Sequence, residues 1–171
     1  MFDPVDIFTF PYIREYDNKK LISIDKADIN IEDDLKTEES EIPEDKKNAF
    51  IQKIQDILKD KVEKVIDSKR LVDSPATLVS GASSLDPQME KILKMMDKNF
   101  SPTKKIFEIN LNHPLMKNLI NKFEDKSNND LIELVIMQLY ESSLMLEGNL
   151  NSPVDYIKRM NELLIKATEC K

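Results

Sequence analysis

The chain has 171 residues, 33% of them charged, with a formal net charge of −7, so it can bury one good hydrophobic core and should be soluble. Its acidic balance, without a basic patch interleaved with aromatic residues, argues against nucleic acid or a membrane surface as a partner. No phosphate-binding glycine motif occurs, no apolar run approaches the ~20 residues that span a bilayer, and the single cysteine, Cys170, suits a reducing compartment such as the cytoplasm.

The first 30 residues carry signals for short elements without the pattern of a complete domain. Asp3-Pro4 predicts the start of a short helix. Asp17-Asn18 predicts a turn before an extended segment at 21–24. We therefore interpret residues 1–30 as the tail of a preceding domain.

An acidic segment separates this tail from the rest of the chain. Between Glu32 and Lys47 there are eight acids, three lysines and few apolar residues. Such a composition cannot bury enough apolar surface to fold, so residues 31–47 are predicted to form a solvated linker. Residues 48–171 then form the main domain.

The main domain contains the elements of an α+β fold. Three short apolar segments predict strands, at residues 62–66, 77–79 and 105–109. Apolar residues at helical spacing, with caps and stop signals, predict helices at 50–58, 86–97, 114–123, 129–147 and 153–167. The sequence therefore predicts a small three-stranded sheet with helices, and the chain ends in a pair of helices.

This terminal pair is the most informative part of the sequence. The first helix of the pair, capped by Asn128 or Asn129 and stopped by Gly148, is apolar nearly all round. The second begins with Ser152 as a cap and Pro153 in the first helical position, and it carries a broad apolar stripe. Both helices need covering surfaces, and a chain of this size has few elements left to supply them.

A second copy of the chain is one source of that cover. Two antiparallel helices from each of two subunits would form an intermolecular four-helix bundle. The predicted dimer interface comprises Leu131, Leu134, Val135, Gln138, Leu139, Met145, Tyr156, Ile157, Met160, Leu163, Leu164 and Ala167. The pattern leaves open the alternative that both helices simply pack on their own sheet.

The sequence offers little for catalysis. His113 is the only histidine, so neither a histidine-containing metal cluster nor a Ser/His/Asp triad can form within one chain, and its context predicts a role at a helix start. The many carboxylates are expected to form solvated surface. We predict no catalytic, cofactor-binding or metal-binding residue.

The helix at 86–97 is rich in methionine, a flexible and polarisable side chain suited to adaptable binding. Its apolar stripe fits either the core or an exposed binding edge. The candidate binding residues are Met89, Ile92, Leu93, Met95 and Met96.

Several motifs, in order and at similar spacing, resemble the C-terminal dimerisation domain of the ninety-kilodalton heat-shock chaperone family, closest to its bacterial HtpG branch. The motifs are VEKV (62–65), RLVDSPA (70–76), DPQMEKIL (86–93), IFEIN (106–110), HPL (113–115), GNL (148–150) and RMNELL (159–164). Residues 1–30 resemble the segment that joins the middle domain of that family to this one. Two departures are Leu111, where proline is usual, and Asn18, where a turn glycine is usual.

The resemblance implies a homodimerisation and client-contact domain of an ATP-dependent chaperone. Met95, which is apolar but lies off the Met89–Met96 stripe, adds the hypothesis that the helix at 86–97 offers an apolar edge to unfolded clients. It places ATP and magnesium in an N-terminal domain and the catalytic arginine in the middle domain, so the chain itself is expected to be no enzyme. Because the chain ends in Glu169-Cys170-Lys171, co-chaperones that bind an acidic tail are not expected. The rival hypotheses are a stand-alone helical adaptor for a different protein and, more remotely, carboxylate chemistry in a cleft of paired acids.

Overall fold

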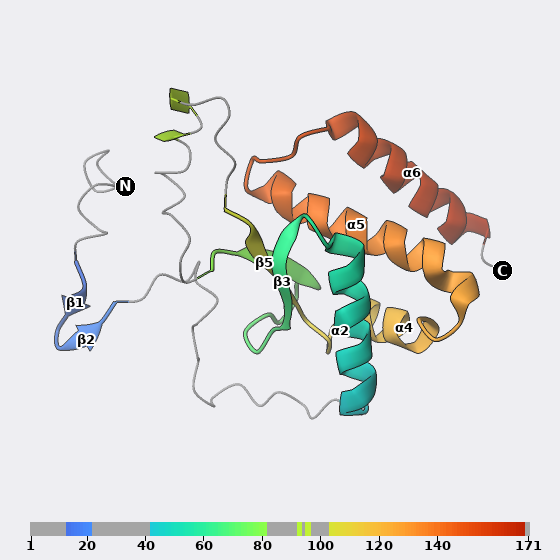
Figure 1. The fold of residues 1–171 in the computed structure, drawn as a ribbon, viewed down its shortest axis with the longest axis horizontal. Helices are drawn as coiled ribbons and strands as arrows, with labels where there is room; N and C mark the ends of the chain where they lie inside the picture. Colours follow the sequence, from blue (N-terminus) through green and yellow to red (C-terminus); the bar gives the residue numbers. More distant parts are fainter. Residues whose placement is uncertain (1–12, 22–41, 82–91, 94, 97–102, 170–171) are drawn as a thin grey trace.

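The computed structural model describes residues 13–21, 42–81, 92–93, 95–96 and 103–169 (Figure 1). These residues contain a three-stranded mixed sheet, four α-helices and a small two-stranded hairpin. The α+β fold class and the three predicted strands are confirmed. Four predicted features lie wholly or largely outside the described residues: the helix after Asp3-Pro4, the extended segment 21–24, the helix at 86–97 and Cys170.

The sheet has the order β3-β5-β4, with strands Val62–Asp67, Lys105–Ile109 and Ala76–Val79. β3 runs parallel to the central strand β5, and β4 runs antiparallel to it. Helix α2 (Glu44–Leu58) packs against β3, and helix α5 (Asn129–Leu146) packs against β4. The sheet is therefore covered by helices that come from opposite ends of the domain sequence.

The remaining two helices differ in how deeply they are placed. The short helix α4 (Pro114–Lys122) contributes three side chains to the core. Helix α6 (Pro153–Glu169) runs alongside α5, and α5 lies between it and the sheet (Figure 1). The alternative prediction was that both terminal helices pack on the sheet. Helix α5 does so, and α6 does not.

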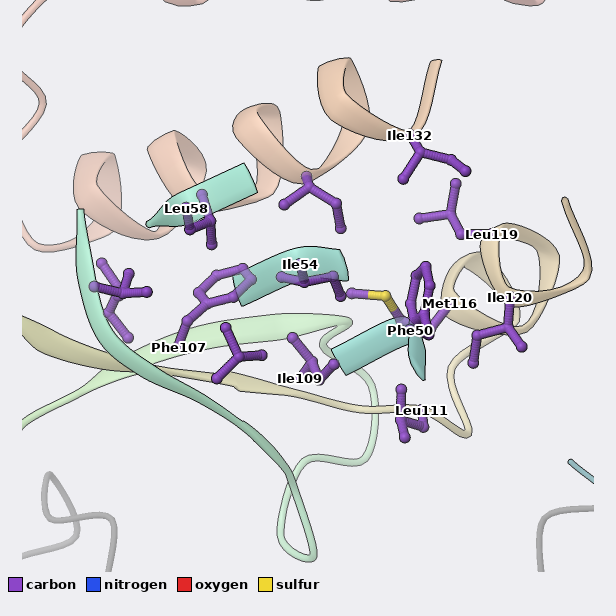
Figure 2. Packing of buried hydrophobic residues seen from close by; sticks show 14 residues of the cluster. Phe50, Ile54, Leu58, Phe107, Ile109, Leu111, Met116, Leu119, Ile120 and Ile132 are labelled. Carbon is purple, nitrogen blue, oxygen red and sulfur yellow. The ribbon is translucent and has the colours of Figure 1, made fainter. Parts of the chain in front are cut away.

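The core lies between α2, the sheet, α4 and α5 (Figure 2). Phe50, Ile54 and Leu58 recur on one face of α2 and are completely buried, as the apolar spacing predicted. They meet Phe107 of β5, whose ring also packs edge-on against Tyr140 of α5 at 6.3 Å between centroids. Since fully burying one such side chain stabilises by about 1.5–3 kcal/mol, this face of α2 is a major source of stability.

The central strand β5 is buried on both of its faces. Ile106, Phe107, Glu108 and Ile109 are all buried, because β5 is flanked by strands on both edges and covered on its faces. Glu108 was expected to be solvent-exposed like the other carboxylates, and that expectation is wrong. Its burial requires a partner for the charge, which is described below.

The N-terminal turn prediction is confirmed. Strands β1 (Glu15–Tyr16) and β2 (Lys19–Lys20) form a hairpin whose two turn residues, Asp17 and Asn18, have φ of 50° and 58°. Positive φ at both positions defines the type of turn whose twist suits a hairpin, and asparagine tolerates it. Further along, α2 begins at Glu44, so the last four residues of the predicted acidic linker are helical.

The ends of the later helices follow the local sequence signals. His113 caps α4, its Nδ1 accepting a hydrogen bond from the Leu115 backbone N–H at 3.1 Å. Gly148, with φ of 72°, ends α5 in a Schellman arrangement, since the N–H groups of Gly148 and Asn149 donate to the carbonyls of Met145 and Leu144. These contacts satisfy carbonyl groups that the helix end would otherwise leave free.

The other two capping predictions differ in outcome. Ser152 accepts a hydrogen bond from the Asp155 backbone N–H at 3.4 Å, and Pro153 takes the first helical position of α6. Asn128 occupies the capping position of α5, but its side chain does not cap the helix. A short 3₁₀ turn (Lys126–Asn128) precedes α5, and Asn128 instead donates its amide to the Lys122 carbonyl at 3.3 Å.

Candidate functional site

The antiparallel pair of α5 and α6 is held together by polar contacts along one seam. The hydroxyl oxygens of Ser142 and Tyr156 lie 3.3 Å apart. One turn further, Arg159 of α6 forms an ion pair with Glu141 of α5, and both side chains are largely buried. These contacts place Tyr156 and Arg159 on the face of α6 that meets its own chain.

A second face of α6 is left open. Ile157 is 51% exposed, Met160 38% and Leu164 55%, and these three residues recur at spacings of three and four along one side of the helix. No residue of α6 is fully buried. The apolar stripe predicted as one broad face therefore divides in two. Tyr156 and Leu163 are half-buried, whereas Ile157, Met160 and Leu164, which we call the α6 stripe, face solvent.

Helix α5 contributes unevenly to the predicted interface. Ile132, Ile136 and Ser143 form its fully buried face toward the core. Of the predicted interface residues, Met145 is exposed, as is Ala167 on α6, and five are only half-buried: Leu131, Leu134, Val135, Gln138 and Leu139. The Gln138 amide oxygen is buried within the chain and has no hydrogen-bond partner among the described residues.

Sequence reasoning missed three further exposed apolar side chains on these two helices. Leu146 follows Met145 at the end of α5, Val154 begins α6, and Ile165 lies next to Leu164. They fall outside the periodic stripe from which the interface was predicted. Leu146 and Val154 could have been identified from their positions on either side of the turn at Gly148. Helix α5 ends with an apolar residue there, and α6 begins with one.

Among the residues of the methionine-rich helix, the structure describes four. Ile92, Met95 and Met96 are exposed, and Leu93 is half-buried. Met89 lies outside the described residues. The three exposed side chains thus form an apolar edge at a place separate in sequence from α5 and α6.

The buried carboxylate of Glu108 belongs to a tight polar cluster. Arg70 donates from Nε to both carboxylate oxygens, at 2.9 and 3.1 Å, and its Nη2 lies 2.7 Å from Oε2. The Ser68 hydroxyl donates to Oε1 at 2.7 Å and accepts from the Leu71 backbone N–H at 2.9 Å. The cluster thus fastens the segment after β3 to the central strand. These charge-assisted hydrogen bonds fix the position of the carboxylate within the fold.

A second ion pair links the sheet to the helix pair. Lys105, at the start of β5, lies 2.7 Å from Glu147, the residue that caps the end of α5. In the part of the chain that the structure describes, no three His, Cys, Asp or Glu side chains are placed to hold a metal ion. Among the same residues, no helix has the length and apolar character needed to cross a membrane.

Comparison with known proteins gives one family. A family model described as "Hsp90 protein" matches residues 1–171. The chain is 46% identical over 168 residues to "Chaperone protein HtpG" of Chlorobium phaeobacteroides and 44% identical over 169 residues to the protein of that name in Chlorobaculum tepidum. It is 34% identical over 166 residues to the one from Legionella pneumophila strain Paris. These alignments cover 96–97% of this chain and only 26–27% of the relatives, so the chain spans about a quarter of their length.

Proposed function

The chain belongs to the Hsp90 family, and we propose that it is the homodimerisation and client-contact segment of a chaperone that assists the folding of unfolded or stress-damaged proteins. The relatives named above are chaperones by their printed names. The observation that carries the proposal is the α6 stripe of Ile157, Met160 and Leu164, an apolar helix face that the described part of the chain leaves exposed.

A second copy of the chain could cover this stripe and remove its apolar side chains from water. The stripe lies beside the seam between α5 and α6, so two copies related by a two-fold axis could place stripe against stripe. Each helix pair would then complete the cover of the other, as in a four-helix bundle. The half-buried residues of α5, such as Leu134 and Val135, would lose their remaining exposure in the same assembly.

Dimerisation would serve the parent chaperone by holding two ATPase arms together. A tether raises the effective concentration of one arm near the other, to the order of millimolar for short flexible connections, so that their closure becomes nearly unimolecular. In this proposal the chain contributes assembly, and ATP and magnesium are bound by other parts of the chaperone. The chain itself then catalyses nothing.

The client-contact part of the proposal is supported by the exposed side chains of Ile92, Met95 and Met96. Unfolded proteins differ in sequence but share exposed apolar groups. Methionine suits such varied partners, because its unbranched thioether side chain can repack against many shapes.

Sedimentation equilibrium of the chain across a wide concentration range tests the proposal. The subunit mass is 19.8 kDa, and we expect twice that mass to persist on dilution to about micromolar, the concentration that corresponds to roughly 8 kcal/mol of association. A monomer at all concentrations would overturn the dimerisation role. A monomer that gains helical order only with a different protein would favour the adaptor hypothesis instead.

A further inference from the structure

The methionines of this chain differ widely in their access to solvent. Met95 and Met96 are adjacent and are 84% and 80% exposed, whereas Met116 in the core is completely buried. Met145 and Met160 have intermediate exposure and lie on the surface that we assign to the dimer. The chain thus places its two most exposed described methionines side by side, on the edge that we assign to clients.

Exposure decides how readily a thioether reacts with a peroxide. The sulfur lone pair attacks one peroxide oxygen, the O–O bond breaks, and the second oxygen leaves as water after a proton shift. Sulfur gives up two electrons and gains one S–O bond, so methionine becomes methionine sulfoxide and hydrogen peroxide becomes water. A buried sulfur such as that of Met116 cannot be approached in this way without local opening.

We propose that Met95 and Met96 form a reversible oxidation site at which peroxide weakens the contact with unfolded clients. This inference rests on the proposed client contact. Sulfoxide formation replaces an apolar side chain by a polar one, and covering a polar group without a hydrogen-bond partner is unfavourable. Methionine sulfoxide reductases reverse the change, with one enzyme for each sulfoxide epimer, so the site can return to its binding form.

The placement of the other methionines separates this site from the dimer. In an assembled dimer Met145 and Met160 would be covered by the second copy, and Met116 is covered by the chain itself. Moderate peroxide should therefore oxidise Met95 and Met96 before it reaches the surface that holds the subunits together. Client contact would be lowered while the dimer persists.

The experiment uses this chain, hydrogen peroxide, and reduced carboxymethylated lactalbumin as a permanently unfolded probe. Peptide mass spectrometry over a time course should show sulfoxide at Met95 and Met96 forming at least about tenfold faster than at Met116. Affinity for the probe should fall about tenfold, because a tenfold rise in the dissociation constant requires only a modest loss of apolar contact. Treatment with both reductases should restore the affinity. Sedimentation of the oxidised chain should still give the dimer mass.

The matched control is the double variant Met95→Leu with Met96→Leu, which keeps apolar side chains of similar size that peroxide cannot oxidise. It should bind the probe before and after peroxide with equal affinity, and circular dichroism checks that it folds. If oxidised wild type binds as tightly as reduced wild type, the oxidation site is overturned while the client contact stands. If the variant also loses binding after peroxide, another methionine is responsible and the inference fails. If the reduced chain does not bind the probe at all, the client contact fails, and the oxidation site fails with it.

Discussion

Replacement of Leu164 by aspartate is the sharpest test of the proposed dimer. Fully burying a leucine contributes about 1.5–3 kcal/mol, and 55% of Leu164 is still exposed in the isolated chain, so its cover in a dimer contributes roughly half of that per subunit. Two copies give about 1.5–3 kcal/mol. The substitution removes this gain and adds two carboxylates, each costing several kcal/mol to desolvate if it stays buried. We expect a loss of at least about 4 kcal/mol, which is roughly a thousandfold in the dissociation constant.

Sedimentation equilibrium of wild type, Leu164→Asp and Met160→Asp at equal concentrations measures this loss directly. Ile165→Asp is the matched control, because Ile165 is 57% exposed and lies on the same helix, but about 100° further round it from the α6 stripe. The first two variants should be folded monomers by circular dichroism, and the control should remain a dimer. Dimer mass in both Leu164→Asp and Met160→Asp, or an equal effect of Ile165→Asp, would refute the assignment of the α6 stripe.

Three further predictions concern stability. Arg70→Ala should lower the free energy of unfolding by about 3 kcal/mol in urea titrations, because it leaves the buried Glu108 without its cation; a loss below about 1 kcal/mol would contradict this. Gly148→Ala should cost only about 1 kcal/mol, from left-handed backbone strain at φ of 72°, since nothing lies within 4 Å of the added Cβ; a cost above about 3 kcal/mol would reveal a clash. Partial desolvation raises the pKa of Asp67, although the residue as a whole is exposed, so its native state holds the proton more tightly than the unfolded chain does. The stability from this group is complete below the unfolded pKa of about 3.9 and is lost as the pH rises through the raised native pKa. The stability of Asp67→Asn relative to wild type should therefore increase between about pH 4 and pH 7. An equal difference in unfolding free energy between variant and wild type at about pH 4 and about pH 7 would contradict the desolvation argument.

Turns and helix ends were predictable because they depend on a few neighbouring residues. Asp17-Asn18 adopts the positive φ that its composition favours, and His113 caps α4 with its own ring nitrogen. Gly148 ends α5 in the conformation that glycine adopts at least cost. The exception is Asn128, whose side chain could reach either the helix start or the Lys122 carbonyl. The local sequence could not show which of these two contacts the side chain makes.

Packing was predictable only where one face of an element is buried. The apolar spacing over residues 50–58 predicted a helix with one buried face, and Phe50, Ile54 and Leu58 of α2 form that face. Glu108 was not, because its burial follows from the central position of β5 between strands from distant parts of the chain. Arg70 is 38 residues away in sequence, and no local signal joins the two side chains.

The sequence by itself determined the family, the α+β class and the amphipathic character of the last helix. Motif order, periodicity and capping depend only on the order of residues along the chain. Only the tertiary structure decided which part of that helix is used within the chain. Tyr156 and Arg159 turn toward α5 because Ser142 and Glu141 are there to receive them. The rotation of α6 about its own axis is set by those partners, and it leaves Ile157, Met160 and Leu164 facing outward. Spacing along a helix defines its apolar face, but the neighbours that a fold supplies determine how much of that face remains exposed.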